Sequence, residues 1–501
     1  MRRHGYFWSG ALMHVCGQRS RVRAIIAIIA ILTLTACGSR RSHEALENAL
    51  RGTGVATTAQ QSGSVSPPTA VPTAGGGTTA GGSGSAGTVI GGGTTSVGTT
   101  SGGSTGSAGA PVTNTGGSTT APNSLVPGVE KCAAEKAPVV IGSVGEQSGL
   151  AGAAVAGGAS MVSAWAAYVN SLGGLRCHPI KFIKADDGAE PSRNAALTEQ
   201  LVEQDHVVAF VFNNAPLAAT GSESYLVSHH IPVVGSEGAD DFYNDYPNFF
   251  PQMPSGRWAI YASYAGLPSQ LTASQRQHVG LIYCIEASAC SIFGSAEGKA
   301  DIAHDGMRLV YSASASLTAP DFSSECLGAK RAGATFLIIV LDPNSIHRAA
   351  ANCRSAGYTG RLGTVASVVV PDDASDSNLN GMIFDSIVKP WTTKGNAQIT
   401  LMNQVISQYA PGLSPIGTPA QGWTAAQIFA YSSTFWPNKQ KISSADITAA
   451  LDKVRHYDAG GLTGPISYYP GRPAPPVVCW FEMSLNKGKF STPDNGKRQC
   501  K

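Results

Sequence analysis

Side chains that could perform catalysis are scattered along this chain and do not form a known catalytic motif. Asp186 and Asp187 could act as a carboxylate pair in acid–base catalysis, although a solvated turn is the simpler interpretation. His229, His230 and His304 lie near the ends of expected elements, where surface or core histidines are more common than ligands. The globular part has no Gly-x-Ser-x-Gly nucleophile elbow, and no His-Glu-x-x-His metal motif occurs. The sequence therefore does not favour an enzyme.

Two glycine-containing stretches resemble anion-binding loops only in part. Residues 294–300 (GSAEGKA) are one residue short of a P-loop, and Ala300 occupies the position of the magnesium-binding Ser or Thr. Residues 143–152 are polar and could hold an anion at the N-terminus of the following helix, but they lack Gly-x-Gly-x-x-Gly. No basic stripe accompanies the net charge of +3. We therefore expect no cofactor, no metal ion and no nucleic-acid partner.

Ten cysteines indicate an oxidising compartment. Cys16 would be lost with a signal peptide and Cys37 would carry lipid, which leaves an even number, eight. No Cys-x-x-Cys is present, so a metal site is the weaker alternative. Adjacency along the chain predicts the disulfides Cys132–Cys177, Cys284–Cys290, Cys326–Cys353 and Cys479–Cys500.

The sequence of the N-terminal region predicts a targeting segment followed by a tether. Three arginines precede the apolar run 24–34, which is too short to span a bilayer comfortably. Residues 34–38 (LTACG) resemble the bacterial lipobox, in which the cysteine becomes the acylated first residue of the mature protein. The alternative is an ordinary secretory signal with an incidental cysteine, and Met13 could be the true start. We expect residues 1–37 to be a lipoprotein signal peptide, with Cys37 as the membrane anchor.

Residues 38–130 are expected to form a disordered tether. From Gly52 to Val129 the chain contains no Asp, Glu, Lys or Arg and is almost entirely Gly, Ser, Thr, Ala and Pro. Such a composition has too little apolar surface to offset the entropy of ordering.

The rest of the chain alternates between strand and helix patterns. Pro138–Gly142 is a buried strand, residues 155–169 have helical spacing of apolar residues, and Ile180–Ile183 is the next strand. This βαβ unit repeats after Pro254. Further strands are expected near 207–212, 231–234, 248–253, 279–285, 307–313, 335–341, 362–370, 382–388, 466–469 and 477–485. Two doubly wound, Rossmann-like α/β lobes fit this pattern better than one large sheet. Ligands bind at the carboxyl ends of such strands, so the 143–152 loop should face a binding crevice.

An ordered series of short motifs resembles the type I periplasmic solute-binding proteins, in particular the branched-chain amino acid receptors of ABC importers. The series covers Ala137 to about Ser491, and the order and spacing of its members make it specific. Its members are Val140–Gly142 with Ser148-Gly149, Val169-Asn170 with Gly173-Gly174, Asp186–Gly188 with Pro191, Ile231–Val234, Ala356–Tyr358, Leu462–Ile466 and Gly488–Phe490.

The resemblance implies two lobes joined by a three-segment hinge, with the ligand in the cleft between them. Lobe one would comprise residues 137–252 and 391–463, and lobe two residues 255–388 and 467–501. The crossings would lie near 252–254, 388–390 and 464–467. The resemblance also implies a monomer that works with an importer permease.

The ligand site departs from the family pattern at several positions. The two hydroxyl residues that usually hold the ligand carboxylate are replaced by Asn213 and Asn214, whereas Ser236 fits the second polar loop. Glu237 and Asp342 could replace the acid that usually meets the ligand ammonium. The residues that we expect to contact the ligand are Gln147, Ser148, Gly149, Asn213, Asn214, Ala215, Ser236, Glu237, Phe293, Asp342 and Ala366.

The function predicted from these observations is capture of a small polar or amphipathic ligand, an amino acid or a related compound, for an ABC importer. The protein would be lipid-anchored on the outer face of a bacterial cell membrane. A ligand sensor with the same fold but without transport is the first alternative, and an exported enzyme that uses the cleft is the second.

Overall fold

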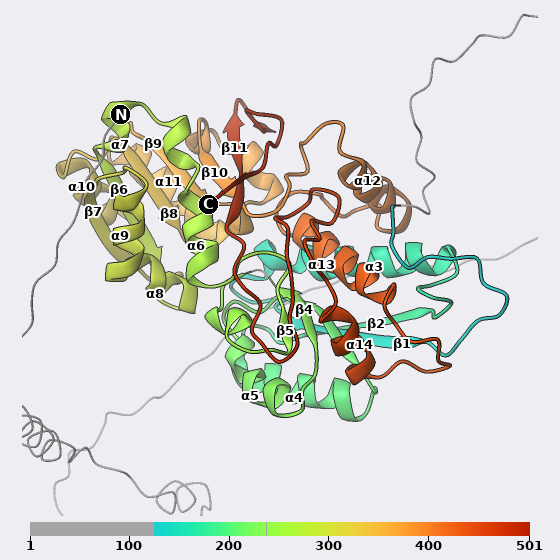
Figure 1. The fold of residues 1–501 in the computed structure, drawn as a ribbon. Helices are drawn as coiled ribbons and strands as arrows, with labels where there is room; N and C mark the ends of the chain where they lie inside the picture. The colour runs from blue at the N-terminus through green and yellow to red at the C-terminus, as the bar shows by residue number, and fades with distance from the viewer. Residues whose placement is uncertain (1–124, 237) are drawn as a thin grey trace, which may run out of the picture. The chain divides into compact units, whose positions relative to one another are not determined.

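The computed structural model describes residues 125–236 and 238–501, which form two α/β lobes (Figure 1). Each lobe is built around one sheet of mainly parallel strands, as the alternating pattern predicts. The predicted signal peptide, Cys37, most of the predicted tether and Glu237 lie outside the described residues.

The sheet of the first lobe has five parallel strands in the order β2-β1-β3-β4-β5. Its central strand β3 is buried along its whole length, because helices cover both faces of the sheet. The strands are β1 Val139–Gly145, β2 Ile180–Asp186, β3 Ala209–Asn213, β4 Val233–Ser236 and β5 Phe249–Phe250. We call this sheet and the helices packed on it lobe one.

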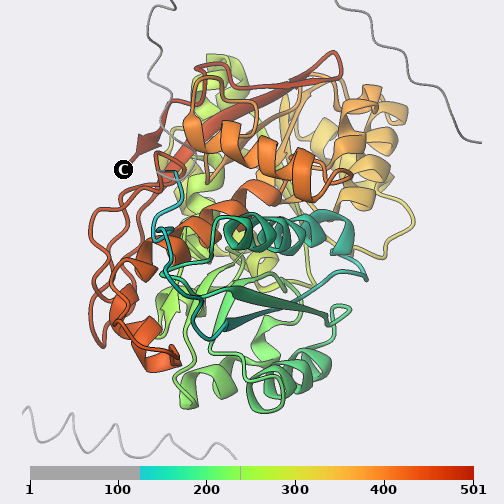
Figure 2. The same ribbon diagram turned by 90° about the vertical axis from the view of Figure 1, so that its right-hand side faces the viewer.

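Helices α3 and α13 cover one face of this sheet, and α4 and α5 lie on the other side (Figures 1 and 2). Helix α3 is apolar enough in composition to cross a membrane, yet 67% of its most apolar window is buried in the protein, as in a core helix. The α-helices of lobe one are α3 Gly152–Ser171, α4 Pro191–Glu203, α5 Glu223–Ser228, α12 Ala397–Tyr409, α13 Pro419–Ser433 and α14 Ser444–Leu451, and its 3₁₀ helices are η2 Ala219–Gly221 and η3 Asp241–Asn244.

The second sheet repeats the strand order of the first, because β7-β6-β8-β9-β10 corresponds to β2-β1-β3-β4-β5. Beyond β10 it continues with antiparallel β11 and β12, and β13 pairs with β11. The strands are β6 Val279–Cys284, β7 Leu309–Ala315, β8 Phe336–Val340, β9 Arg361–Val365, β10 Ile383–Ser386, β11 Cys479–Asn486, β12 Lys489–Ser491 and β13 Gln499–Cys500. This sheet and its helices form lobe two.

Two layers of helices cover the second sheet. Helices α6, α8 and α9 contact one another in one layer, whereas α10 and α11 form a second contacting pair. The α-helices of lobe two are α6 Arg257–Tyr264, α7 Ala273–Arg276, α8 Ser288–Gly294, α9 Ala296–His304, α10 Ser323–Arg331 and α11 Pro343–Ser355. Its 3₁₀ helices are η4 Leu267–Gln270, η5 Ala366–Val368, η6 Pro371–Ala374 and η7 Ser377–Leu379.

The chain crosses between the lobes three times, after β5, after β10 and after α14. Hydrogen bonds hold the crossing segments together. The Thr463 hydroxyl donates to the Gln252 carbonyl at 2.6 Å, and the Lys389 amide donates to the Leu462 carbonyl at 2.7 Å. The residues at which each lobe begins and ends stay predictions.

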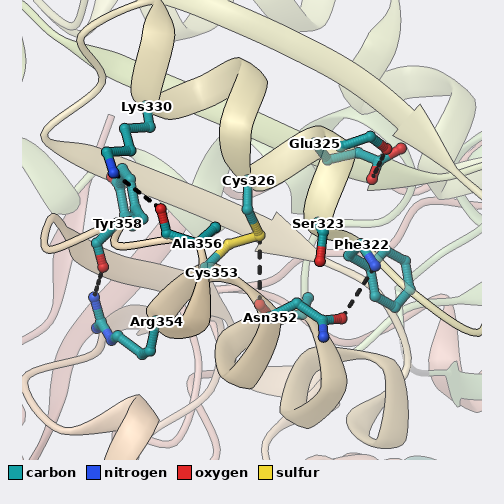
Figure 3. The surroundings of a disulfide bond; sticks show 12 residues. Phe322, Ser323, Glu325, Cys326, Lys330, Asn352, Cys353, Arg354, Ala356 and Tyr358 are labelled. Atoms are coloured by element: carbon teal, nitrogen blue, oxygen red, sulfur yellow. Dashed lines mark hydrogen bonds between the residues drawn. A yellow bond between two sulfur atoms is a disulfide. The ribbon is translucent and has the colours of Figure 1, made fainter.

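Four disulfides join Cys132 to Cys177, Cys284 to Cys290, Cys326 to Cys353 and Cys479 to Cys500, the pairs that adjacency predicts. The third ties α10 to α11 in lobe two (Figure 3). Neighbouring hydrogen bonds support this link, because the Phe322 amide donates to the Asn352 side chain and Lys330 donates to the Ala356 carbonyl.

Several sequence-based boundaries are wrong, including that of the strand expected at 248–253, of which only Phe249–Phe250 is β-strand. Residues 125–130, assigned to the tether, pack on lobe one, where Val126 is buried and Glu130 forms an ion pair with Arg176. The strand expected at 362–370 ends at Val365 because the chain then turns into η5. Residues 466–469 form no strand, and Ile466 makes only an isolated bridge to Tyr457.

Candidate functional site

A cavity lies where the carboxyl ends of the two sheets face each other, and residues from both lobes line it. The volume of the cavity is about 120 Å³, measured as the space that the centre of a water molecule can occupy. This is enough for a small organic molecule. Lobe one contributes Ala151, Ala154, Val155, Pro216, Leu217, Gly238 and Ala239, from the segments that follow β1, β3 and β4. This is the position in which open α/β sheets bind ligands.

Lobe two supplies the larger part of the lining, and most of it is apolar. Helices α6 and α8 contribute directly, although the sequence analysis predicted neither of them. The lining residues of lobe two are Ala259, Ile260, Ser263, Cys284, Ala287, Ala289, Cys290, Phe293, Leu317, Val340, Leu341, Asp342, Pro343, Val365, Ser367, Val368 and Ile387. The Cys284–Cys290 disulfide therefore forms part of the cavity wall.

Asp342 is the ionisable side chain among the described lining residues. It caps α11, because its Oδ1 accepts hydrogen bonds from the Asn344 and Ser345 amides at 3.0 and 3.3 Å. Pro343 occupies the first helical position, which favours this start. The other oxygen, Oδ2, is buried and has no hydrogen-bond partner. A buried acceptor without a partner is costly, so a ligand donor that reached Oδ2 would be stabilised there.

The wall of lobe one is backed by buried acids. Glu146 is fully buried, and its Oε1 accepts a hydrogen bond from the amide of the lining residue Leu217 at 2.8 Å. Burial raises the pKa of Glu146 to about 7, and the negative charges of Asp187 and Asp240 add to the effect. Hydrogen bonds from the backbone amides of Leu217 and Ala151 act to lower the pKa of Glu146, because they favour its charged form.

Asp240 connects the lobes beside the cavity. Its Oδ1 accepts a hydrogen bond at 2.8 Å from the hydroxyl of Ser288, which begins α8 in lobe two. Burial raises the pKa of Asp240 to about 7, and the Ser288 hydrogen bond works in the opposite direction. The disulfide between Cys284 and Cys290 encloses Ser288, so it restrains the segment that makes this interlobe contact.

The predicted pair Asn213 and Asn214 does not line this cavity, because both amides bond within lobe one. The Asn213 carbonyl oxygen accepts from the Val144 amide at 3.0 Å, and Asn214 donates to the Val155 carbonyl at 2.7 Å. The preceding Phe212 has φ +62°, in the left-handed region that bulky residues rarely adopt. This conformation interrupts the strand alternation that would otherwise direct successive side chains to opposite faces.

Gln147, Ser148 and Gly149 form a turn around Asp186 outside the cavity lining. The Gln147 and Ser148 amides and the Ser148 hydroxyl all donate to the Asp186 carboxylate. Partial burial acts to raise the pKa of Asp186, but the hydrogen bonds from the Ser148 hydroxyl and the surrounding amides outweigh it, so the pKa is lowered. Gln147 and Ser148 of the 143–152 loop therefore bind Asp186 at the end of β2 in this structure.

The other predicted site residues are divided between the cavity and its surroundings. Phe293 and Asp342 line the cavity. Ser236 is buried, and its hydroxyl accepts from the Gly238 amide. Ala215 belongs to the apolar core on the α4–α5 side of lobe one, whereas Ala366 is buried between the lining residues Val365 and Ser367. Whether any of them contacts a ligand stays a prediction.

A comparison with protein-family models matches residues 138–489, well over half of the chain, to the periplasmic binding protein family. The chain belongs to this family. No curated protein matches the sequence. The family assignment agrees with the two lobes, the matching strand orders and the cavity between the sheets.

Solved structures of several solute-binding and transporter proteins share the fold at low sequence identity. A possible leucine/isoleucine/valine-binding protein from Rhodopirellula baltica is 17% identical with a TM-score of 0.61, and the match covers 72% of this chain and 98% of that one. A branched-chain amino acid transporter protein from Thermus thermophilus with bound valine is 15% identical, with a TM-score of 0.60 and coverage of 72% and 96%. A solute-binding protein from R. palustris in complex with benzoate is 16% identical, with a TM-score of 0.57 and coverage of 71% and 95%.

The apolar character of this periplasmic binding protein's cavity is not apparent from the sequence. Leu217, Ile260, Leu317, Val340 and Ile387 come from five separate segments, and no local pattern marks them as neighbours. One available signal was the Asp-Pro pair directly after the most apolar strand, which is typical of a helix cap at a strand end. Among the described residues, no group of three His, Cys, Asp or Glu side chains could hold a metal ion.

Proposed function

We propose that this protein is an extracytoplasmic solute-binding protein that captures a small molecule between its lobes for an ABC importer. The observation that carries the proposal is the cavity at the facing carboxyl ends of the two sheets, with lining residues from both lobes. A ligand there contacts both lobes only when they are closed, so binding shifts the population towards the closed state. Membership of the family and the transporter proteins of similar fold support this function.

Blocking the cavity should abolish ligand binding. Ala289 is a half-buried lining residue on α8, and Ala289→Trp would place an indole in the space that a ligand needs. A ligand at 100 times its dissociation constant stabilises the wild type by about 2.7 kcal/mol, and we expect Ala289→Trp to remove that effect. Thermal unfolding of the full chain with a panel of amino acids, amides, sugars, nucleosides, amines, alcohols and small acids measures it.

The matched control is Ala332→Trp, an exposed alanine at the end of α10 in the same lobe, which should respond as the wild type does. A ligand that stabilises the wild type and Ala289→Trp equally would place binding elsewhere. A panel without any response would count against capture of these solute classes.

We also propose that Cys37 carries the lipid that holds the protein at the outer face of the membrane. Replacing Cys37 with serine should move the protein from the membrane fraction of cells that export it into the culture medium, because the acyl chains supply the anchoring free energy. Immunoblots of the two fractions measure the distribution, with Cys16→Ser as the control. Retention of Cys37→Ser on the membrane would contradict the lipid anchor.

A further inference from the structure

The described lining of the cavity pairs a largely apolar surface with a single carboxylate. Ala, Val, Leu, Ile, Pro and Phe side chains make up most of the wall from both lobes. The Ser263 hydroxyl also lies there but already donates to the Ala259 carbonyl at 2.8 Å. The Ser367 hydroxyl makes no hydrogen bond within the described residues. The lining acceptor that is buried and without a partner is Oδ2 of Asp342, and the Asp342 residue is 7% exposed. A ligand that fits this lining is mostly hydrocarbon and carries a donor for that oxygen.

The charges around the cavity disfavour an anionic ligand. Glu146 and Asp240 lie directly behind the lobe-one wall, and no Lys, Arg or His is among the described lining residues. The guanidinium of Arg348 donates through Nη2 to the carbonyls of Leu317 and Ala319 and lies over Phe322, and its Nε is buried without a partner. Arg348 is not among the lining residues. A ligand carboxylate would therefore be desolvated beside Asp342 without a cation to compensate it.

The residues expected to hold an amino acid carboxylate do not line the cavity. The Asn213 carbonyl oxygen and the Asn214 amide bond within lobe one, and the Ser236 hydroxyl accepts from Gly238. The α11 amides at the cavity are already bound by Asp342 Oδ1. Asn213, Asn214 and Ser236 therefore offer no donor to an anion in the cavity, and the Ser367 hydroxyl is the one side-chain donor of the described lining without a partner.

We propose that the cavity binds an apolar amine or alcohol whose N–H or O–H group donates to Asp342 Oδ2, and that it rejects carboxylates and zwitterionic amino acids. The inference rests on the proposed function and names its ligand class. An ammonium group gains most, because a hydrogen bond between two charged groups in a buried site is stronger than one between neutral groups.

Two matched series of probes test the ligand class. 3-Methylbutylamine, 3-methylbutan-1-ol, 3-methylbutanoate and L-leucine share a branched hydrocarbon body, and benzylamine, benzyl alcohol, benzoate and L-phenylalanine share an aromatic one. Titration calorimetry on the full chain should show that the amine binds most tightly in at least one series. The carboxylate and the amino acid should bind at least tenfold more weakly.

Asp342→Asn separates recognition from folding, because asparagine caps a helix as well as aspartate does. The variant should bind the amine at least tenfold more weakly, and its amide N–H groups should reduce the discrimination against the carboxylate. Asp245→Asn removes the same charge at an exposed position of lobe one and should leave all affinities unchanged.

Failure of this inference can be told apart from failure of the proposed function. Binding of leucine or a carboxylate that matches the amine, or wild-type amine affinity in Asp342→Asn, would overturn the ligand class. The proposed function would still stand if Ala289→Trp blocked that binding. Absence of binding by both amines would also overturn the inference. The proposed function would fail only if Ala289→Trp removed the stabilisation by none of the panel compounds.

Discussion

Replacement of Gly422 by valine is expected to lower the free energy of unfolding by about 3 kcal/mol or more. Gly422 lies on α13 where this helix crosses α3, and a Cβ atom there would be 2.3 Å from the Gly158 carbonyl oxygen and 3.1 Å from the Gly158 Cα atom. These are backbone atoms, so the clash cannot be relieved by a rotamer change. Helix α3 cannot retreat either, because Gly158 lies against the ring of the buried Phe212.

The damage should extend to the cavity, because α3 carries the lining residues Ala154 and Val155. Thr418, which precedes α13, donates to the carbonyls of both. Urea unfolding followed by the fluorescence of the buried Trp165 and Trp423 measures the loss of stability.

Gly412→Val is the matched control for this substitution. Gly412 is exposed, and a Cβ atom at this position would meet no other atom within 4 Å. We therefore expect Gly412→Val to change the free energy of unfolding by no more than about 0.5 kcal/mol. Equal unfolding midpoints for Gly422→Val and the wild type would show that the two helices can separate at no cost.

Most of the fold could be predicted from the sequence because its strands are continuous apolar runs. Phe336–Val340 is buried at every position, and such a run between turn residues favours a central parallel strand. Helices α6 and α8 escaped prediction because they are short and their positions depend on contacts with α9 and on the Cys284–Cys290 disulfide. Tertiary contacts of this kind leave no periodic signal.

The candidate site was harder to predict than the fold, because a residue's place at a strand end does not tell which way its side chain points. Asn213 ends β3 and Asn214 follows it, as expected of ligand-binding residues, yet the amide groups of both bond inside lobe one, directly after the positive φ of Phe212. Asp342 follows β8 in the same way and lines the cavity because it caps α11 with only one of its oxygens. The difference between these residues lies in backbone geometry.

Glu146 should make the protein less stable as the pH rises from about 4.5 to about 7. The pKa of Glu146 is raised to about 7 in the folded protein, chiefly by burial, and returns towards the ordinary glutamate value on unfolding. Between these values the folded state binds more protons than the unfolded state, so the free energy of unfolding falls with rising pH and levels off above pH 7. The shift corresponds to a loss on the order of 3 kcal/mol.

Glu146→Gln should remove this part of the pH dependence. Glutamine keeps an oxygen that can accept from the Leu217 amide but cannot ionise, so at pH 8 the variant should be more stable than the wild type by on the order of 3 kcal/mol. Urea unfolding at pH 5 to 8 measures both profiles. His347, whose pKa is also raised, contributes equally to both proteins and cancels in the difference. Asp240, whose charge acts on Glu146, cancels only in part.

The exposed Glu199→Gln on α4 is the control for Glu146→Gln, and its profile should follow that of the wild type. Parallel profiles for Glu146→Gln and the wild type would show that the buried carboxyl does not titrate in this range. A loss of the pH dependence in Glu146→Gln would instead mean that an acid directly behind the cavity wall becomes charged near pH 7. Because that charge lies beside the Leu217 amide, binding of a cationic amine should then strengthen as the pH rises through 7, in the opposite direction to the stability of the empty protein.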